Sequence, residues 1–311
     1  MPRSPRVLSI QSHVVAGCVG NKAAVFPLQL LGFEVDAVNT VQFSNHTGYP
    51  LWKGKVLSGE ELWDLIDAME TNGLLSQYTH LLTGFIGSLS LLHTIHRVLL
   101  KLREYNPALV YVCDPVQGDN GQLYVSPDLP PAFRSELTPI ATIMTPNQLE
   151  AELLTERSIG SVQEALDACA QLHRLGPHTV VITSLDLEPD HVTVLASTTQ
   201  PQAEGALSTF RILVPRVQAY VTGTGDLFTA LLLGWLHKEP GHVQLAVEKA
   251  LAGLQIILRD SVGTEADGQA PENWQRTKRT AEICRQRELQ LVQHSEALLH
   301  PHVTYRAEAV P

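Results

Sequence analysis

Residues 222–226 read Thr-Gly-Thr-Gly-Asp, and an apolar, helix-compatible stretch of residues 227–235 follows them directly. Two glycines let the backbone of such a turn approach an anion closely, and the N–H groups at the start of a helix attract negative charge. The turn therefore indicates a phosphate site, with Asp226 beside it as a proton acceptor. From these five residues alone, an ordinary turn in which Asp226 caps the helix is equally compatible.

The composition predicts an ordinary globular protein. The chain has 311 residues, of which 44% are hydrophobic and 17% charged, so it can bury a sizeable core. Its formal net charge of -10 argues against a nucleic-acid partner, since such proteins usually present a clustered basic surface. No apolar run approaches the roughly 20 residues that cross a bilayer, and the start of the chain lacks the apolar region of a signal peptide. We therefore expect a cytoplasmic protein without a membrane partner.

The cysteines support a reducing compartment. They are neither paired in spacing nor dense, and they stand at Cys18, Cys113, Cys169 and Cys284. Disulfide frameworks are instead typical of short, cysteine-rich secreted chains. We therefore expect four free thiols.

Apolar segments that predict strands alternate with helix-compatible segments along most of the chain. The expected strands are residues 7–10, 35–38, 81–83, 109–113, 141–144 and 179–182, and the expected helices include 23–31, 60–69 and 89–105. Such alternation, with nearly continuous apolar strands, indicates a largely parallel sheet covered by helices on both faces. The predicted fold is a three-layer α/β/α sandwich.

Two regions depart from this alternation. Residues 191–196 and 209–214 read as consecutive strands with no helix between them, which predicts an antiparallel edge of the sheet. Residues 263–277 are polar and read as a surface excursion before a helix-compatible stretch at 280–291. Neither region indicates a domain boundary, so we expect residues 1–311 to form a single domain.

Polar side chains follow most of the predicted strands. In an open parallel sheet the ligand crevice lies at the carboxyl ends of the strands, so these side chains are expected to gather at one edge. They are Gln11, Ser12, His13, Asn39, Thr40, Thr83, Gly84, Asp114, Asp119, Thr145, Asn147, Glu150, Thr183 and Ser184. The edge thus combines carboxylates, amides and hydroxyls.

Two common nucleotide motifs are absent from the sequence. No P-loop pattern is found, and no third glycine completes a dinucleotide fingerprint after Gly225. The turn instead resembles that of the ribokinase-like superfamily, in which a Gly-Thr-Gly-Asp turn at a helix start carries the catalytic aspartate. Within it the chain resembles the pyridoxal kinase family over nearly its whole length, at residues 7–14, 41–49, 111–116, 145–154 and 289–293. The most specific of these is Val-Gln-Phe-Ser-Asn-His-Thr-Gly-Tyr at 41–49.

The resemblance implies a role for each matching position. Asp226 is the expected base, within a catalytic turn formed by Gly223, Thr224 and Gly225. The expected contacts to the substrate ring are Ser12, Val19, Phe43, Thr47 and Phe85, with Asp226. The expected ATP contacts are Asp114, Asn147, Glu150, Thr183, Ser184, Val217, Ala219 and Thr224. The expected metal surroundings are Asp114, Asp119, Thr145 and Glu150, whose hard oxygen atoms suit Mg²⁺.

Simpler interpretations stay open for several of these residues taken singly. Phe43 alone is more typical of core packing, Asp114 of a plain turn before proline, and Glu150 of an acid in the first turn of a helix. Two positions depart from the family pattern. Phe85 stands where pyridoxal kinases commonly have tyrosine, so a hydroxyl contact is lost while stacking survives, and Ser88 stands where some members have an acid.

The resemblance implies ATP-dependent phosphorylation of the 5'-hydroxyl of pyridoxal, pyridoxine and pyridoxamine. It also implies Mg²⁺, a monovalent cation such as K⁺ or Na⁺, and a homodimer. Two alternatives stay open, a hydroxymethylpyrimidine kinase and a catalytically silent homologue that binds pyridoxal phosphate. The segment 41–49 favours pyridoxal over the first, and intact Gly223, Gly225 and Asp226 argue against the second.

Overall fold

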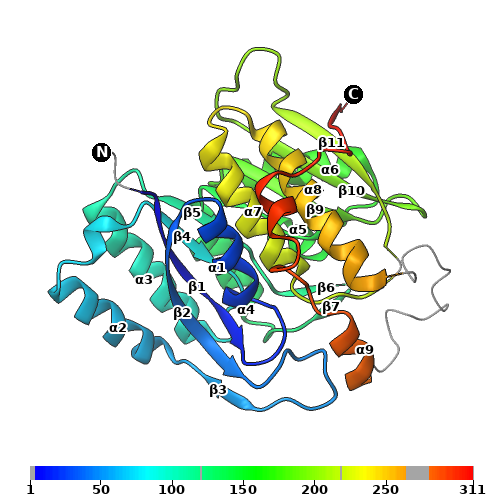
Figure 1. The fold of residues 1–311 in the computed structure, drawn as a ribbon. Coiled ribbons are helices and arrows are strands. Elements are labelled where there is room, and N and C mark those ends of the chain that lie inside the picture. Colours follow the sequence, from blue (N-terminus) through cyan, green and yellow to red (C-terminus); the bar gives the residue numbers. More distant parts are fainter. Residues whose placement is uncertain (1–3, 120, 218, 264–279, 311) are drawn as a thin grey trace.

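The computed structural model of the chain describes residues 4–119, 121–217, 219–263 and 280–310. Within these residues one sheet of ten strands runs through the molecule in the order β12-β11-β10-β9-β8-β5-β4-β1-β2-β3 (Figure 1). The strands are β1 (Arg6–Val14), β2 (Glu34–Phe43), β3 (Gly54–Val56), β4 (His80–Thr83), β5 (Val110–Cys113), β8 (Ile143–Met144), β9 (Thr179–Leu185), β10 (His191–Thr198), β11 (Thr209–Pro215) and β12 (Glu308–Ala309). A separate hairpin consists of β6 (Gly118–Asp119) and β7 (Gln122–Leu123).

The helices connect the strands, and those expected at 23–31, 60–69 and 89–105 are confirmed as α1, α2 and α3. They are α1 (Asn21–Leu30), α2 (Gly59–Thr71), α3 (Leu89–Tyr105), α4 (Leu129–Ala132), α5 (Gln148–Thr155), α6 (Val162–Leu175), α7 (Thr224–Lys238), α8 (Val243–Val262), α9 (Ala281–Gln286) and α10 (Ser295–Leu299). Short turns of other helix types lie at η1 (Leu75–Gln77), η2 (Phe133–Leu137) and η3 (Thr138–Ile140).

The centre of the sheet is parallel, as the sequence predicts. β1 pairs in parallel with β2 and β4, and the parallel ladder continues through β5 and β8 to β9. The predicted antiparallel edge is confirmed, because β10 pairs antiparallel with both β9 and β11. The short outer strands β3 and β12 were not predicted; each pairs antiparallel with its neighbour.

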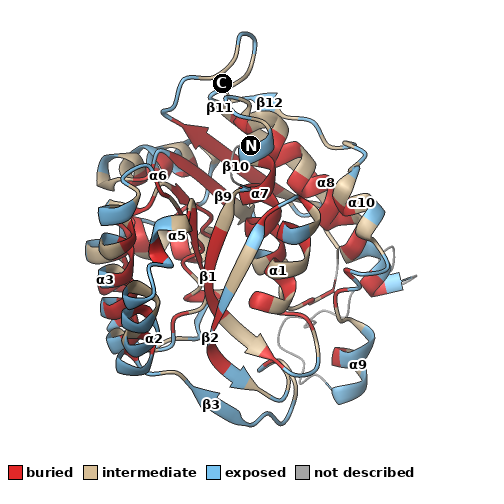
Figure 2. Ribbon diagram, turned by 60° about the vertical axis from the view of Figure 1, so that its left-hand side comes forward, coloured by how far each residue is buried: buried red, intermediate tan, exposed pale blue. Residues whose placement is uncertain are grey.

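Helices cover both faces of the sheet, which confirms the three-layer sandwich. Side chains of α1, α7 and α8 form one hydrophobic cluster, and those of α2, α3, α5 and α6 form a second. The two groups of helices lie on opposite faces of the sheet (Figures 1 and 2). Alternate residues of a strand point to opposite faces. Thus Val181 of β9 packs in the first cluster, whereas Val180 and Ile182 pack in the second. Burial on both faces explains why the central strands read as continuous apolar runs.

Three strands are longer than their apolar cores. β1 continues to Val14 and β2 to Phe43, with an irregular register between Gln11 and Ser12, and β9 continues to Leu185. Several polar residues expected after strands therefore lie within them. The physical reason is that the ladder consists of backbone hydrogen bonds, which do not require apolar side chains.

The C-terminal part differs from its prediction. The helix expected at 280–291 is limited to the short α9, because the chain turns at Arg287. The excursion predicted at 263–277 lies almost wholly outside the described residues.

No helix of the described part is long and apolar enough to span a membrane. All four cysteines are buried thiols that form no disulfide bond, as expected.

Candidate active site

The glycine turn before α7 owes its shape to close packing against the loop between β1 and α1. Gly223 is the N-cap of α7 and has φ of 88°, in the left-handed region that favours glycine. A Cβ atom at this position would lie 2.3 Å from the carbonyl oxygen of Cys18, so no other residue fits without displacing the backbone. The turn therefore places the first N–H groups of α7 next to the β1–α1 loop.

Asp226 lies in the first turn of α7 and is not its cap, so the capping interpretation is wrong. Its Oδ2 atom accepts a hydrogen bond from the backbone N–H of Gly20, at 2.8 Å. Burial raises the pKa of Asp226 to about 6, although the Gly20 N–H acts in the opposite direction. A carboxylate with a pKa near the working pH is suited to accept a proton.

Two predicted substrate residues lie directly at this turn. A Cβ atom on Gly20 would lie 2.4 Å from Oγ of Ser12, so the Ser12 hydroxyl is beside the N–H that contacts Asp226. Val19 is buried, and its Cγ1 atom lies 3.3 Å from the Cβ position of Gly223. The structure thus brings Ser12 and Val19 together with Asp226, although they are more than 200 residues apart in the sequence.

The other predicted ring contacts come from two further strand ends. Phe43 ends β2, and its ring lies 4.7 Å from that of Trp52, so it packs on a neighbouring aromatic side chain and is only half-buried. Thr47 is exposed in the loop between β2 and β3, and Phe85 is half-buried after β4. Their contact with a substrate ring stays a prediction. Ser88 has a clear local role, because its hydroxyl caps α3 by accepting from the Leu91 N–H at 3.3 Å.

Asp114 approaches the same turn from the end of β5. It is buried, with 4% of its surface exposed, and a Cβ atom on Gly225 would lie 3.6 Å from its Oδ2. The Thr229 hydroxyl of α7 donates to this oxygen at 3.4 Å and also pairs with the Thr145 hydroxyl at 2.8 Å. Burial, together with the charges of nearby carboxylates including Asp226, raises the pKa of Asp114 well above its usual range. Asp114 is therefore more than a plain turn residue.

Glu150 and Asn147 form a capping box at the start of α5. Oε2 of Glu150 accepts from the Asn147 N–H at 2.9 Å, and its Oε1 accepts from the Gln117 N–H at 2.9 Å. The first-turn interpretation of Glu150 is therefore confirmed. Burial raises the pKa of Glu150 to about 8, although the N–H groups of Asn147, Gln117 and Gly118 lower it; nearby Asp119 raises it further. The cap and a role toward the phosphates are compatible, since each carboxylate oxygen has two lone pairs.

These carboxyl groups form a cluster of acidic side chains. Among the described residues, Asp114, Glu150 and Asp226 take part in no ion pair with a basic side chain. Within the same residues no three His, Cys, Asp or Glu side chains lie close enough together to form a complete metal site. The donor set of carboxylates and hydroxyls fits a hard cation such as Mg²⁺, which keeps water and phosphate ligands besides one or two carboxylates.

Among the described residues, the predicted ATP residues of β9 and of the segment after β11 make no hydrogen bond with Asp114, Glu150 or Asp226. Thr183 and Ser184 are half-buried within β9, and the Thr183 N–H donates to the Pro146 carbonyl at 2.9 Å. Val217 and Ala219 pack against the core cluster of α7. Their contact with a nucleotide stays a prediction.

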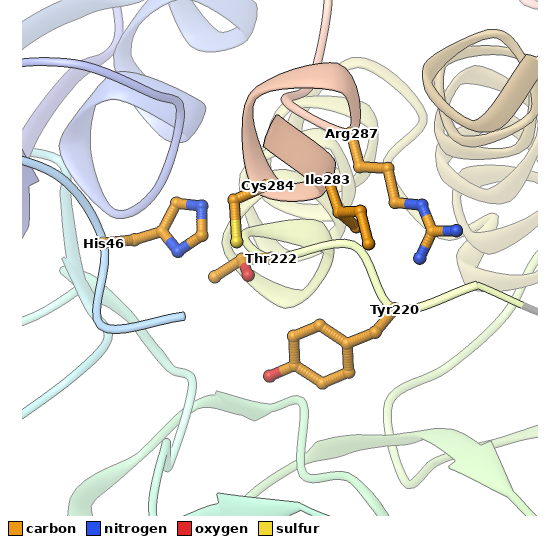
Figure 3. Close-up of a pocket in the computed structure, with 6 residues that line it drawn as sticks. All are labelled: His46, Tyr220, Thr222, Ile283, Cys284 and Arg287. Atoms are coloured by element: carbon orange, nitrogen blue, oxygen red, sulfur yellow. The ribbon is translucent and has the colours of Figure 1, made fainter. Parts of the chain in front are cut away.

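Sequence reasoning missed one prominent group, the carboxylate of Glu288 after α9. It contacts Cys18, His46 and Tyr49, which come from the first 50 residues. No local pattern marks an acid in this segment, because its partners are about 240 to 270 residues away. A pocket beside it is lined by His46, Tyr220, Thr222, Ile283, Cys284 and Arg287, with α9 on one side and the turn before α7 on the other (Figure 3).

A mainly parallel sheet between two helix layers, with a glycine turn and an aspartate at the start of α7, defines a kinase of the ribokinase-like class. Residues 77–271 match a family model described as phosphomethylpyrimidine kinase. The pyridoxal kinase of Arabidopsis thaliana is 49% identical over 303 residues, which cover 97% of this chain and 94% of the relative. The pyridoxal kinase of Homo sapiens is 43% identical over 317 residues, covering 99% of each chain. The chain belongs to the pyridoxal kinase family.

Solved structures agree with this assignment. The pyridoxal kinase from Leishmania donovani in complex with ADP and pyridoxamine has a TM-score of 0.85 and 36% identity, and the match covers 98% of this chain and 99% of that one. The pyridoxal kinase from Trypanosoma brucei has a TM-score of 0.81 and 33% identity, with full coverage of both chains.

Proposed function

We propose that this chain transfers the γ-phosphate of ATP to the 5'-hydroxyl of pyridoxal, pyridoxine and pyridoxamine, with Asp226 as the base. Membership of the pyridoxal kinase family supports ATP-dependent phosphorylation of vitamin B6. The Leishmania donovani relative binds ADP together with pyridoxamine or pyridoxine. The observation that carries the mechanism is the Asp226 carboxylate, held by the Gly20 N–H at the start of α7.

Asp226 accepts the proton of the 5'-hydroxyl in this mechanism. Its pKa of about 6 leaves the carboxylate mostly ionised at neutral pH and still basic enough to take a proton. The N–H groups of the turn and of the first turn of α7 face the transferred phosphoryl group and stabilise its negative charge. Ser12 and Val19, which flank Gly20 and Gly223, hold the ring so that its hydroxyl meets Asp226.

The residues that would hold magnesium are Asp114, Asp119, Thr145 and Glu150. When bound, Mg²⁺ neutralises charge on the ATP phosphates during transfer. The raised pKa values of Asp114 and Glu150 support this role, since two buried carboxyl groups near each other gain from a nearby cation. Asn147, Thr183, Ser184, Val217, Ala219 and Thr224 are the proposed nucleotide contacts.

Replacing Asp226 with Asn tests the base directly. The amide keeps the size of the side chain but cannot accept the proton, so we expect kcat to fall by about 100-fold or more, whereas ATP affinity stays within about threefold. Turnover follows from coupled detection of ADP, and ATP binding from calorimetry. Near-normal turnover of D226N would exclude Asp226 as the base.

The family model described as phosphomethylpyrimidine kinase keeps hydroxymethylpyrimidine as a second candidate substrate. ADP formation measured with pyridoxal, pyridoxine, pyridoxamine and hydroxymethylpyrimidine separates the two activities. We expect the three B6 vitamers to be preferred. No turnover of any of the four would instead indicate a catalytically silent homologue.

We further propose that residues 1–311 form one kinase domain, that a monovalent cation such as K⁺ or Na⁺ assists it, and that the protein is a cytoplasmic homodimer. The continuous ten-stranded sheet supports a single domain, and the absence of disulfide bonds among the four cysteines suits a reducing compartment. Exposed Val56 of the edge strand β3, with exposed Leu51 and Trp52 in the loop before it, offers apolar surface to a second copy. Sedimentation velocity would give the oligomeric state.

A further inference from the structure

Both carboxylate oxygens of Glu288 are engaged by residues from the start of the chain. Oε2 accepts from the Cys18 N–H at 2.9 Å. Oε1 accepts from the Tyr49 hydroxyl at 3.0 Å and lies 3.2 Å from Nε2 of His46. A Cβ atom on Gly17 would lie 2.5 Å from Oε1, so this glycine, with φ of 95°, leaves the space that the carboxylate occupies. We call Glu288 and these contacts the Glu288 bridge.

The geometry around His46 orients its ring for this contact. Nδ1 of His46 accepts a hydrogen bond from the Gly48 N–H at 3.1 Å. The ring hydrogen then lies on Nε2, which donates to Glu288. Burial acts to raise the pKa of Glu288, but the hydrogen bonds from His46, Tyr49 and Cys18 outweigh it and the pKa is lowered. Glu288 is therefore a carboxylate at neutral pH, with three donors directed at it.

The two segments that the bridge joins carry the residues nearest to the proposed chemistry. Cys18 is two residues before Gly20, whose N–H holds Asp226. Its carbonyl oxygen also packs under Gly223. The second segment contains Thr47, between His46 and Tyr49. The Glu288 side chain therefore holds two loops together: residues 15–20, which contact Asp226, and residues 44–53, which contain Thr47.

Neighbouring residues of the C-terminal segment make the same connections. Leu289 is buried, and its Cδ1 atom lies 3.3 Å from the Cβ position of Gly223. The thiol of Cys284 in α9 donates to the Gly48 carbonyl at 3.3 Å. Figure 3 shows Cys284 on α9 near His46 and Thr222. The segment 284–289 therefore lies across both loops and the phosphate turn.

We propose that Glu288 is a positioning residue for the vitamin substrate, because its carboxylate holds residues 15–20 and 44–53 in the arrangement that binds the ring beside Asp226. This inference rests on the proposed function and adds to it a residue that touches neither substrate nor nucleotide. Disruption of the bridge weakens binding of pyridoxal and leaves the binding of ATP nearly intact, since Glu288 contacts Cys18, His46 and Tyr49, and none of the expected ATP residues is among its partners in the described part of the chain.

Glu288→Gln is the sharpest replacement, because it changes one oxygen into an NH₂ group and keeps the volume. Only one of the two oxygens can remain an acceptor, so either the Cys18 N–H or the donors His46 and Tyr49 lose their partner. We expect the KM for pyridoxal to rise about 10-fold and the KM for ATP to stay within about twofold. A merely structural loss would lower the amount of active enzyme, and so kcat, while leaving both KM values unchanged.

Two further variants support this experiment. Glu282→Gln removes the same charge from an exposed position of α9 and is expected to leave both KM values unchanged. Tyr49→Phe removes one donor and keeps the Cys18 contact, so we expect a rise of about threefold in the KM for pyridoxal alone. If E288Q does not fold, Tyr49→Phe decides the kinetic question.

Hydrogen exchange of the ligand-free protein tests the bridge independently of activity. In E288Q, peptides that cover residues 15–20 and 44–53 should exchange about 10-fold faster than in the parent chain, and in E282Q they should not. If the parent fails to phosphorylate pyridoxal, the proposed function is wrong, and exchange still decides whether the bridge holds the loops. Unchanged exchange, or equal rises in both KM values, would overturn the inference.

Discussion

Asp226 acquires its chemical character from its surroundings. An aspartate in water is fully ionised well below neutral pH, but burial at the start of α7 raises the pKa of this one to about 6. The Gly20 N–H prevents a larger rise and fixes one oxygen, so the side chain stays both ionisable and oriented. The sequence alone identifies the aspartate, whereas its basicity depends on residues about 200 positions away.

The pKa of Asp226 predicts how kcat/KM decreases toward acidic pH, which is the acid limb of the pH profile. Asp226 must be ionised to accept a proton, so kcat/KM should be level above about pH 7 and fall about tenfold per pH unit below pH 6. An unperturbed aspartate would place this limb near pH 4. The profile is measured with pyridoxine, and the residual activity of D226N should lack the limb. A limb at pH 4 in the parent chain would contradict the burial argument.

At the scale of elements, the start of α7 is determined by backbone geometry. Gly223 combines a positive φ with contact to the Cys18 carbonyl, so the turn and the β1–α1 loop can form only together. The start of α5 is determined differently, through the reciprocal bonds of Asn147 and Glu150. Both helix starts were predictable, because caps and glycine turns are local signals. That they meet at one site was predictable only from the parallel sheet.

Replacing Gly223 with Ala tests the turn. The Cβ atom would lie 2.3 Å from the Cys18 oxygen, so we expect unfolding free energy to fall by about 2–4 kcal/mol and kcat/KM by at least about 10-fold. Gly205→Ala is a matched control, because its φ is 80° but no atom lies within 4 Å of the added Cβ. It should cost only about 1 kcal/mol and leave activity unchanged. Denaturant unfolding and ADP detection measure both. Equal effects of the two changes would show that close packing at Gly223 is unimportant.

At the scale of the whole molecule, the end of the sheet opposite the site is closed by a ring cluster. His80 begins β4, and its ring meets those of Phe33 and His237 at 5.3 Å each. Burial, together with the nearby His237, lowers the pKa of His80 to about 4. In the folded protein the His80 imidazole is therefore neutral at neutral pH. Its contact with His237 connects β4 with the last turn of α7, the helix whose first turn carries Asp226.

This cluster predicts loss of stability in mild acid. The unfolded chain protonates His80 near pH 6.5 and the folded chain only near pH 4, so stability is full above pH 6.5 and decreases as the pH falls toward 4. Between pH 7.5 and 5 the His80 contribution is ~2 kcal/mol. In urea unfolding, the decrease in unfolding free energy between pH 7.5 and 5 should be smaller in His80→Asn than in the parent chain by about this amount. The replacement His302→Asn, at an exposed position, should leave the decrease as large as in the parent chain. If the unfolding free energy of His80→Asn decreases as much as that of the parent chain, the inference that His80 is buried in its neutral form is wrong.

The sequence by itself determined the layers and the parallel centre and antiparallel edge of the sheet, and it predicts site residues that follow strands or start helices. These features depend on local periodicity and on the rule that parallel strands end at one edge. Tertiary structure alone decided the length of β1, β2 and β9, the short α9, the pKa of Asp226 and the contacts of Glu288. Each depends on contacts between residues far apart in the chain, such as Cys18 with Glu288, and no local pattern encodes such a contact. The glycine turn was visible from residues 222–226 alone, whereas the residues that surround it were brought together by the fold.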